Sequence, residues 1–234
     1  MSPVQLNSAF LEYLVTDHEV TQDPHKLPPL MALSKELGIS VSTLREQMEA
    51  ARTLGLIEAR PRTGIRRLPY QFTPAVWNSL TYAIALDPVN FQSFADLRRN
   101  LEIAYWHTAA AALTCEDHQA LKSLVTKAWE KLHGSPIQIP HAEHRALHLT
   151  IYNRLGNPFV QGVLEAYWDA YEAVGLSLYA DYPYLQEVWI YHQQMVDAIC
   201  AGDLQAGYEA LVKHTDLFQH LPVPGEAGMK VVAR

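Results

Sequence analysis

The sequence predicts a mainly α-helical protein, with an N-terminal winged helix-turn-helix followed by a C-terminal antiparallel helical bundle. Three observations support this prediction. Apolar residues recur at helical spacing along most of the 234 residues, two short strand-like runs near residue 60 flank a turn, and no alternating run after residue 75 is long enough for a sheet. The expected domains are residues 1–70 and 75–221, with a flexible tail over 222–234.

The composition is that of a globular protein. Hydrophobic residues make up 49% of the chain and charged residues 18%, which excludes a disordered or collagen-like chain. No run of 18 apolar residues occurs, so we expect no membrane-spanning helix, and the first residues show no secretory signal. Cys115 and Cys200 form no CxxC motif, which favours a reducing compartment, and we expect the cytoplasm.

The charge is unevenly distributed along the chain. The net charge of −7 argues against a protein that binds nucleic acid over its whole surface. Residues 1–70 hold eight basic and eight acidic residues, whereas residues 71–234 hold ten basic and seventeen acidic ones. Four arginines crowd one short stretch of the first part, Arg60, Arg62, Arg66 and Arg67. A DNA-binding surface would therefore lie in the N-terminal part.

The first 55 residues predict three short helices. The first carries an apolar residue at every fourth position from Leu6 to Leu14, and the second carries its apolar face within residues 30–37. Gly38 is a natural stop for the second helix. Ser40 is a good N-cap for the third helix, which we expect to end at Gly55.

A hairpin follows the third predicted helix. Residues 56–60 and 65–68 are short strand candidates around the turn-forming segment 61–64. Two short helices with a tight turn, then a basic hairpin, predict a winged helix-turn-helix whose second helix enters the major groove of DNA. The alternative is a small helical subdomain with a solvated arginine cluster, and the wing leads us to favour DNA binding. The candidate DNA-contacting residues are Ser42, Thr43, Arg45, Arg60, Arg62, Thr63 and Gly64.

From about residue 75 the sequence predicts six or seven helices, separated by proline or glycine breaks. Two of the eleven histidines, His144 and His148, are four residues apart and so share one helix face. His192 lies ten residues before Gly202 and His214 twelve residues after it, so in an antiparallel hairpin both lie about 15–18 Å from the turn. Imidazole binds zinc, nickel, copper and iron, so three helices could bring four ligands into one bundle interior.

Ordinary structural roles are the alternative for these residues. Any single histidine can be a hydrogen-bonded core or surface residue, and His141 is the first of the other histidines to reconsider as a ligand. Aromatic residues at helical spacing predict core packing first and a ligand pocket second, and they are Tyr105, Trp106, Tyr152, Tyr167, Trp168 and Tyr171. Arg98 is either an inward clamp for a carboxylate or one half of a surface pair with Glu102. The candidate effector-binding residues are Arg98, Tyr152 and Asn153.

Two segments resemble the GntR family of transcription regulators, FadR subfamily, with the FCD type of effector domain. The first runs from Lys26 to Leu68, and the second from about Asp96 to Leu217, including HRALHLTIYNRLGNP and HQQMVDAICAGDLQAGYEALVKH. The resemblance implies a homodimer that binds double-stranded operator DNA through its N-terminal domains and is gated by a small molecule. It also implies one divalent metal per chain, with zinc or nickel expected.

The resemblance implies a ligand set for this metal. The family often uses an Asp-x-x-x-His pair and two later histidines, which here match His148, His192 and His214, while His144 stands at the aspartate position. Four imidazoles could close a tetrahedral zinc site, or an octahedral metal could keep open positions, and we favour the second. Loss of the carboxylate raises the charge of the site by about one unit, which favours an anionic effector.

The DNA-binding segment also departs from the family. Met31 and Val41 stand where relatives often carry arginine, whereas Arg45 is retained. Fewer cationic contacts would weaken binding to phosphate or guanine, so an unusual operator is expected.

The favoured function is a metabolite-responsive, dimeric transcription regulator in which a small carboxylate binds the metal and Arg98. One alternative is a DNA-binding regulator whose bundle holds no metal and serves dimerisation. The other is a metal-dependent bundle enzyme, which would need inward glutamates in Glu-x-x-His motifs, and neither Glu143 nor Glu187 has that spacing. We therefore predict no catalytic residue and no enzyme.

Overall fold

The computed structural model divides into two compact units, Met1–Asn78, called the head below, and Ser79–Arg234, called the bundle. It describes residues 6–16, 25–60, 64–173 and 181–217. The division falls inside helix α4 (Thr73–Leu86). The candidate DNA contacts Arg62 and Thr63 and the expected tail over 222–234 lie outside the described residues.

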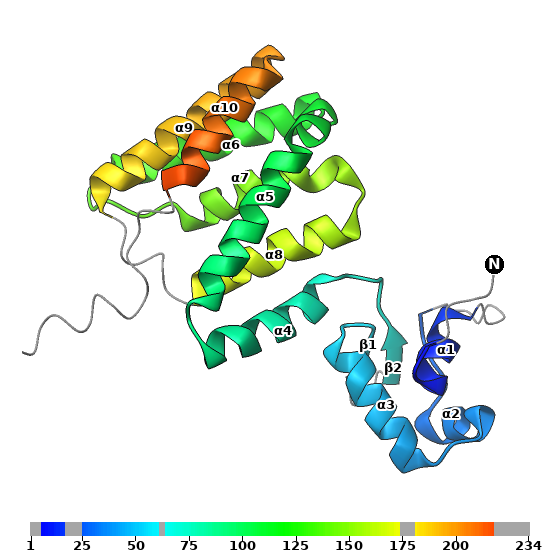
Figure 1. Ribbon diagram of the computed structural model, residues 1–234. Coiled ribbons are helices and arrows are strands. Elements are labelled where there is room, and N and C mark those ends of the chain that lie inside the picture. The colour runs from blue at the N-terminus through cyan, green and yellow to red at the C-terminus, as the bar shows by residue number, and fades with distance from the viewer. Residues whose placement is uncertain (1–5, 17–24, 61–63, 174–180, 218–234) are drawn as a thin grey trace, which may run out of the picture. The chain divides into compact units, whose positions relative to one another are not determined.

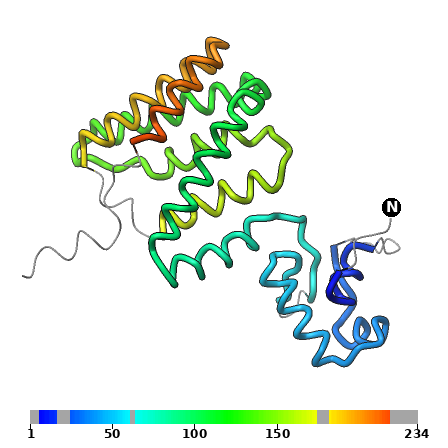
Figure 2. Tube along the Cα trace, in the orientation of Figure 1, coloured from blue at the N-terminus to red at the C-terminus, as the bar shows by residue number. Residues whose placement is uncertain are grey.

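The head has the expected three helices and hairpin (Figures 1 and 2). Its elements are α1 (Ala9–Val15), α2 (Leu30–Leu37), α3 (Val41–Thr53), β1 (Ile57–Arg60) and β2 (Gly64–Arg67). Strands β1 and β2 pair antiparallel, with Ile57 opposite Arg67 and Arg60 opposite Gly64. Their inward residues close a small apolar core with Phe10, Leu33 and Leu44, each of which is fully buried. The predicted winged helix-turn-helix is therefore confirmed.

Local signals set the turn between α2 and α3. Gly38 takes a left-handed conformation with φ of 65°, which ends α2 and which a residue with a Cβ adopts only with strain. The Ser40 side chain then accepts a hydrogen bond from the Thr43 backbone N–H, which satisfies one of the free donors at the start of α3. Helices α2 and α3 are thereby joined by the short turn that a helix-turn-helix needs.

One strand-like contact in the head was not expected from the sequence. The Leu27 N–H donates to the Ile65 carbonyl at 2.9 Å, and the Arg67 N–H donates to the His25 carbonyl at 2.7 Å. The segment before α2 thus pairs with β2, although Pro28 and Pro29 follow it directly. Arg67 is also held by its guanidinium, which donates to the Leu14 carbonyl at 2.9 Å. Arg67 therefore connects strand β2 to the segment before α2 and to the end of α1.

The bundle is helical throughout its described residues. It comprises the end of α4, then α5 (Asn90–Ala111), α6 (Cys115–Leu132), α7 (His141–Tyr152), the 3₁₀ turn η1 (Asn153–Leu155), α8 (Pro158–Ala173), α9 (Tyr182–Ala201) and α10 (Leu204–Leu217). No helix in the described ranges combines the length and the apolar character needed to cross a membrane.

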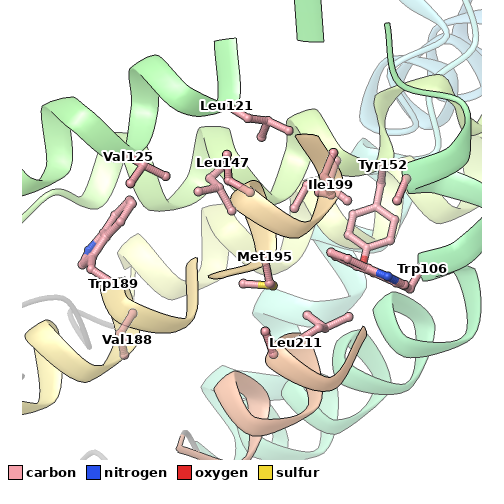
Figure 3. Packing of buried hydrophobic residues seen from close by; sticks show 14 of the residues in the cluster. Trp106, Leu121, Val125, Leu147, Tyr152, Val188, Trp189, Met195, Ile199 and Leu211 are labelled. Atoms are coloured by element: carbon pink, nitrogen blue, oxygen red, sulfur yellow. The ribbon is translucent and has the colours of Figure 1, made fainter. Parts of the chain in front are cut away.

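The helices of the bundle pack around one apolar core (Figures 1 and 3). Helices α9 and α10 form an antiparallel hairpin that turns at Gly202, whose φ is 76°. Helix α6 packs against α7 and α9, and α5 packs against α7, α8 and α10. Trp106 of α5 is fully buried, and its indole N–H donates to the Leu204 carbonyl at 2.8 Å. A Cβ at Gly207 would lie 2.5 Å from the Trp106 ring, so glycine is needed there for α10 to approach α5.

Candidate functional site

Four histidines from three helices meet in the interior of the bundle. His144 and His148 lie one turn apart on α7, and the turn at Gly202 brings His192 of α9 beside His214 of α10. The ring centroids of His192 and His214 are 4.3 Å apart, and those of His144 and His148 are 5.1 Å apart. One ring nitrogen from each of the four lies within 4.8 Å of the others. These four residues are called the histidine cluster below.

The histidine cluster leaves several buried ring nitrogens without a partner. His148 and His192 are fully buried, and their Nε2 atoms lie 3.1 Å apart. Among the described residues, no hydrogen-bond partner reaches His144 Nε2, His192 Nδ1 or His214 Nδ1, although all three atoms are buried. Buried polar atoms are nearly always paired in native proteins, so three unpaired nitrogens in one cluster are donors or acceptors that a bound ion or water could pair.

The geometry suits a transition metal. Nitrogens held about 2.1 Å from a tetrahedral zinc stand about 3.4 Å apart, so rings whose ligand atoms already lie within 4.8 Å need only small movements. Burial lowers the pKa of each of these four histidines well below the ordinary value of 6.5, and the positive charge of nearby Arg98 acts in the same direction. The rings are therefore neutral at pH 7, which is the form that binds metal.

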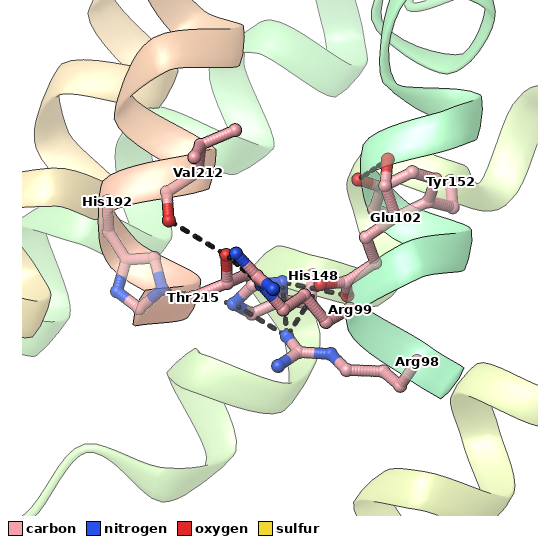
Figure 4. Close-up of polar contacts among 8 residues, drawn as sticks. All are labelled: Arg98, Arg99, Glu102, His148, Tyr152, His192, Val212 and Thr215. Carbon is pink, nitrogen blue, oxygen red and sulfur yellow. Dashed lines mark hydrogen bonds and ion pairs between the residues drawn. The ribbon is translucent and has the colours of Figure 1, made fainter. Parts of the chain in front are cut away.

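An ion pair on α5 lies against the histidine cluster (Figure 4). Arg98 and Glu102 are both buried, and Arg98 Nη2 lies 2.9 Å from Glu102 Oε2. Arg98 Nη2 also lies 2.9 Å from His148 Nδ1, and Glu102 Oε1 lies 3.1 Å from the same nitrogen. Arg98 thus faces inward, and the surface pair considered from the sequence is not what the structure shows.

Burial affects both charges of this ion pair. Burial opposes the charge on Arg98, yet the Glu102 carboxylate raises the pKa of Arg98 above its ordinary value. Burial raises the pKa of Glu102, while the Arg98 guanidinium counteracts that rise. Sequence reasoning did not assign Glu102 a role at the site. The signal was present, because Phe91, Ala95 and Trp106 mark a buried face of α5 on which residues 98 and 102 also fall.

Aromatic rings from α8 cover the same region. The Arg98 guanidinium lies over the Tyr167 ring at 4.8 Å and over the Trp168 ring at 5.2 Å. Trp168 also contacts His144, with ring centroids 4.6 Å apart, and its buried indole N–H has no acceptor in the described part of the chain. Tyr171 is a further neighbour of His144. Trp168 and Tyr171 therefore line the histidine cluster and Tyr167 lies against Arg98, whereas Trp106 belongs to the core.

The other candidate effector-binding residues lie close by in sequence but differ in their contacts. The Tyr152 hydroxyl donates to the backbone carbonyl of Glu102 at 2.9 Å, so this side chain supports α5. The Asn153 amide lies 3.4 Å from Asp117 Oδ1, at the start of α6, and Arg154 binds the same carboxylate. Arg154 holds the pKa of Asp117 well below its ordinary value. The side-chain amide of Asn153 therefore bonds to α6.

A small cavity reaches the histidine cluster from the side of α7 and α9. Its volume is about 20 Å³, which is room for one water molecule. His141 and His144 line it together with Tyr171 and Tyr184. His141 thus lies near the cluster, but its ring is not one of the four that converge.

The candidate DNA contacts of the head lie at the start of α3 and in the wing. Ser42, Thr43 and Arg45 are exposed, and the hydroxyls of Ser42 and Thr43 both lie 2.9 Å from the Ser40 hydroxyl. Arg60 is exposed at the end of β1 and pairs with Glu58 at 2.9 Å. Gly64 begins β2 with φ of 82°. Met31, the residue noted in place of a family arginine, is 71% exposed.

The FCD domain family model matches residues 93–217, which is more than half of the chain and contains all four clustered histidines. The chain belongs to the GntR family of transcription regulators, in the branch with an FCD domain. The proteins of this family are transcription regulators that bind operator DNA and are not enzymes. The FCD domain is their effector-binding domain.

Two relatives fit this family assignment. The chain is 25% identical over 191 residues to the uncharacterized HTH-type transcriptional regulator YieP of Escherichia coli K12. This alignment covers 79% of this chain and 80% of YieP. The solved structure of a GntR protein from Streptococcus agalactiae matches with a TM-score of 0.61 and 18% identity, and the match covers 83% of this chain and 88% of that one. The second comparison concerns the fold alone.

Proposed function

We propose that the FCD domain binds one divalent metal, zinc or nickel, through His144, His148, His192 and His214. The observation that carries this proposal is the convergence of one ring nitrogen from each of the four histidines within 4.8 Å, in a cluster where three buried ring nitrogens have no partner among the described residues. An all-imidazole site suits zinc or nickel, and its four neutral ligands do not compensate the charge of the ion. Elemental analysis of protein purified without chelator tests the proposal, with about one ion per chain expected and a value near zero contradicting it.

We further propose that the effector is a small carboxylate that binds the metal and Arg98 in a more open form of the bundle, because the cavity beside the histidine cluster measures only about 20 Å³ in the form described above. Both groups are cationic, and a guanidinium binds a carboxylate through two parallel hydrogen bonds. The buried Nε of Arg98 and the indole N–H of Trp168 have no acceptor among the described residues, so they can supply further donors. Effector binding would shift the population of bundle conformations and thereby the spacing of the two DNA-binding domains of a dimer.

A metal-free bundle is the second candidate function for this site. The His148 and His192 Nε2 atoms lie 3.1 Å apart, which is also the distance of a direct hydrogen bond between the two rings. In that case the bundle would serve dimerisation and would gain no stability from added zinc. Thermal denaturation with and without zinc separates the two candidates, because only a metal site shifts the melting temperature.

We propose that Ser42, Thr43 and Arg45 read bases and that the wing, with Arg60, Arg62, Thr63 and Gly64, contacts the DNA backbone or minor groove. Replacement of Arg45 by alanine is expected to weaken binding to the cognate operator by about 1–3 kcal/mol, because an exposed arginine at the start of the recognition helix can contact guanine. Electrophoretic mobility shifts on an operator selected from random DNA measure the change.

A matched control uses Arg52, which lies at the end of the same helix and pairs with Glu49 at 2.6 Å. Arg52→Ala is expected to leave operator affinity within about twofold, since its guanidinium already has a carboxylate partner. Equal binding by wild type and Arg45→Ala would show that Arg45 does not read the operator.

We propose that the chain is a homodimer. Four apolar side chains at the end of α4 and the start of α5 are 46–69% exposed, and they are Tyr82, Leu86, Val89 and Leu97. Exposed apolar groups of this kind are typical of subunit interfaces. Leu86→Glu is expected to convert the dimer to a monomer in light scattering at micromolar concentration.

The dimer prediction has a control in the bundle. Ile137 is 53% exposed in the loop before α7, so Ile137→Glu changes an exposed apolar residue away from α4 and should leave the dimer intact. A wild type that is monomeric with and without DNA would refute the dimer.

A further inference from the structure

His148 Nδ1 lies between two groups that make opposite demands on it (Figure 4). Arg98 Nη2, which can only donate a hydrogen bond, is 2.9 Å away, and Glu102 Oε1, which accepts as a carboxylate, is 3.1 Å away. A neutral imidazole has one N–H, so Nδ1 either donates to Glu102 or accepts from Arg98. The two contacts cannot both be hydrogen bonds at the same time.

The choice at Nδ1 decides what Nε2 of the same ring can do. When Nδ1 carries the hydrogen and donates it to Glu102, Nε2 keeps a lone pair, and its neighbours are His192 Nε2 at 3.1 Å and Arg98 Nη2 at 3.2 Å. A metal ion would take this lone pair in place of the Arg98 contact. When Nδ1 accepts from Arg98, Nε2 carries the hydrogen and cannot bind a metal. Metal binding through Nε2 therefore requires that the Glu102 contact prevails.

We propose that Glu102 is the positioning residue of the metal centre, which holds His148 with its Nδ1–H directed at the carboxylate and its Nε2 directed at the metal. The inference rests on the proposed metal site. Carboxylates that orient ligating histidines in this way are common in metalloproteins. Here Glu102 would also supply the buried negative charge that the histidine at position 144 does not provide.

The surroundings of Glu102 fit this role. Its side chain is fully buried one turn after Arg98, and the Tyr152 hydroxyl donates to its backbone carbonyl at 2.9 Å. Tyr152 belongs to the same helix as His148, so this hydrogen bond fixes the turn of α5 that carries Glu102 against the turn of α7 that carries the ligand. The carboxylate is thus held in place before any metal binds.

The test compares zinc affinities, measured by competition with a chromogenic chelator. Glu102→Gln keeps the shape of the side chain but removes its charge, and its amide can present N–H groups to His148. The expected affinity is about 10–100-fold weaker than that of wild type. Glu143→Gln is the matched control, because Glu143 is also a buried carboxylate in the bundle but pairs with Lys131 at 2.8 Å. Its affinity should stay within about twofold of wild type.

The outcomes separate the inference from the metal site itself. If wild type binds zinc and Glu102→Gln binds it equally well, the inference is wrong and the metal site stands. If wild type binds no zinc, the proposed metal site is wrong, and the inference about Glu102 that rests on it is wrong as well. Loss of affinity in Glu143→Gln as large as in Glu102→Gln would show a general effect of buried charge and overturn the specific role.

A measurement on the wild type covers the case in which Glu102→Gln does not fold, since that variant leaves Arg98 without its carboxylate partner. Histidine ¹⁵N spectra of the zinc-loaded protein report which ring nitrogen carries the hydrogen, with the His148 signals identified from their loss in His148→Gln. The proposal requires a protonated Nδ1 and a metal-bound Nε2. A metal-bound Nδ1, or an Nε2 that carries hydrogen in the loaded protein, would overturn it.

Discussion

Replacement of His192 or His214 by alanine is expected to reduce bound metal from about one ion per chain to near zero. Both rings lie in the centre of the histidine cluster, 4.3 Å apart, and they come from the two arms of the α9–α10 hairpin. A metal bound to the folded state alone stabilises it by about 2.7 kcal/mol at a free concentration one hundred times Kd, so the variants should lose this increment. Elemental analysis and urea unfolding with and without zinc measure both effects.

The quantity to compare between variants is the increase in the free energy of unfolding when zinc is added. An alanine in place of a buried histidine also leaves a cavity, which lowers the stability whether or not zinc is present. His133 is exposed at the end of α6, and His133→Ala should keep both the metal and the response to zinc. His144→Asp should also keep the metal, since aspartate is a good ligand and would lower the charge of the site. Wild-type metal content in His192→Ala and His214→Ala would remove these residues from the ligand set.

The metal-free protein is expected to lose stability as the pH falls below about 6.5. Burial lowers the pKa of the four clustered histidines well below 6.5, so the unfolded chain takes up protons that the folded chain does not. The free energy of unfolding therefore rises with pH up to about 6.5–7 and then levels off. Each histidine contributes up to about 1.4 kcal/mol per pH unit on the acid side.

Urea unfolding of chelator-treated protein at about pH 5.5, 6.5 and 7.5 measures this dependence. Replacement of His192 by glutamine should reduce the slope between the two lower values, because one of the protons excluded from the folded state is then absent from both states. Equal stability at about pH 5.5 and 7.5 would contradict burial of four neutral histidines.

The sequence predicts the helix ends and the histidine convergence because both depend on local geometry. Gly38 and Ser40 end and begin helices through their own backbone and side-chain hydrogen bonds, whatever surrounds them. His192 and His214 come together because the rise per residue of a helix is constant and Gly202 turns the chain directly back. Neither inference needs knowledge of distant contacts.

Other parts of the site depend on contacts between distant segments. An Arg98–Glu102 pair has the same i, i+4 spacing on an exposed face as on a buried one, so the pair alone does not reveal its burial. Only the apolar residues of α5 on the same helix face reveal that the pair is buried. The pairing of Leu27 with Ile65 has no local signal either, because a strand partner nearly forty residues away leaves no periodicity in a three-residue segment.

The central claim is that the four histidines of the FCD domain hold one metal ion, and anomalous X-ray diffraction from crystals of zinc-loaded protein tests it most directly. Data collected on either side of the zinc absorption edge locate the ion without assumptions about its ligands. The account predicts one anomalous peak per chain, about 2.1 Å from a ring nitrogen of each of His148, His192 and His214, with His144 as the fourth ligand. No peak inside the histidine cluster, or a zinc ion bound only elsewhere on the chain, would contradict it.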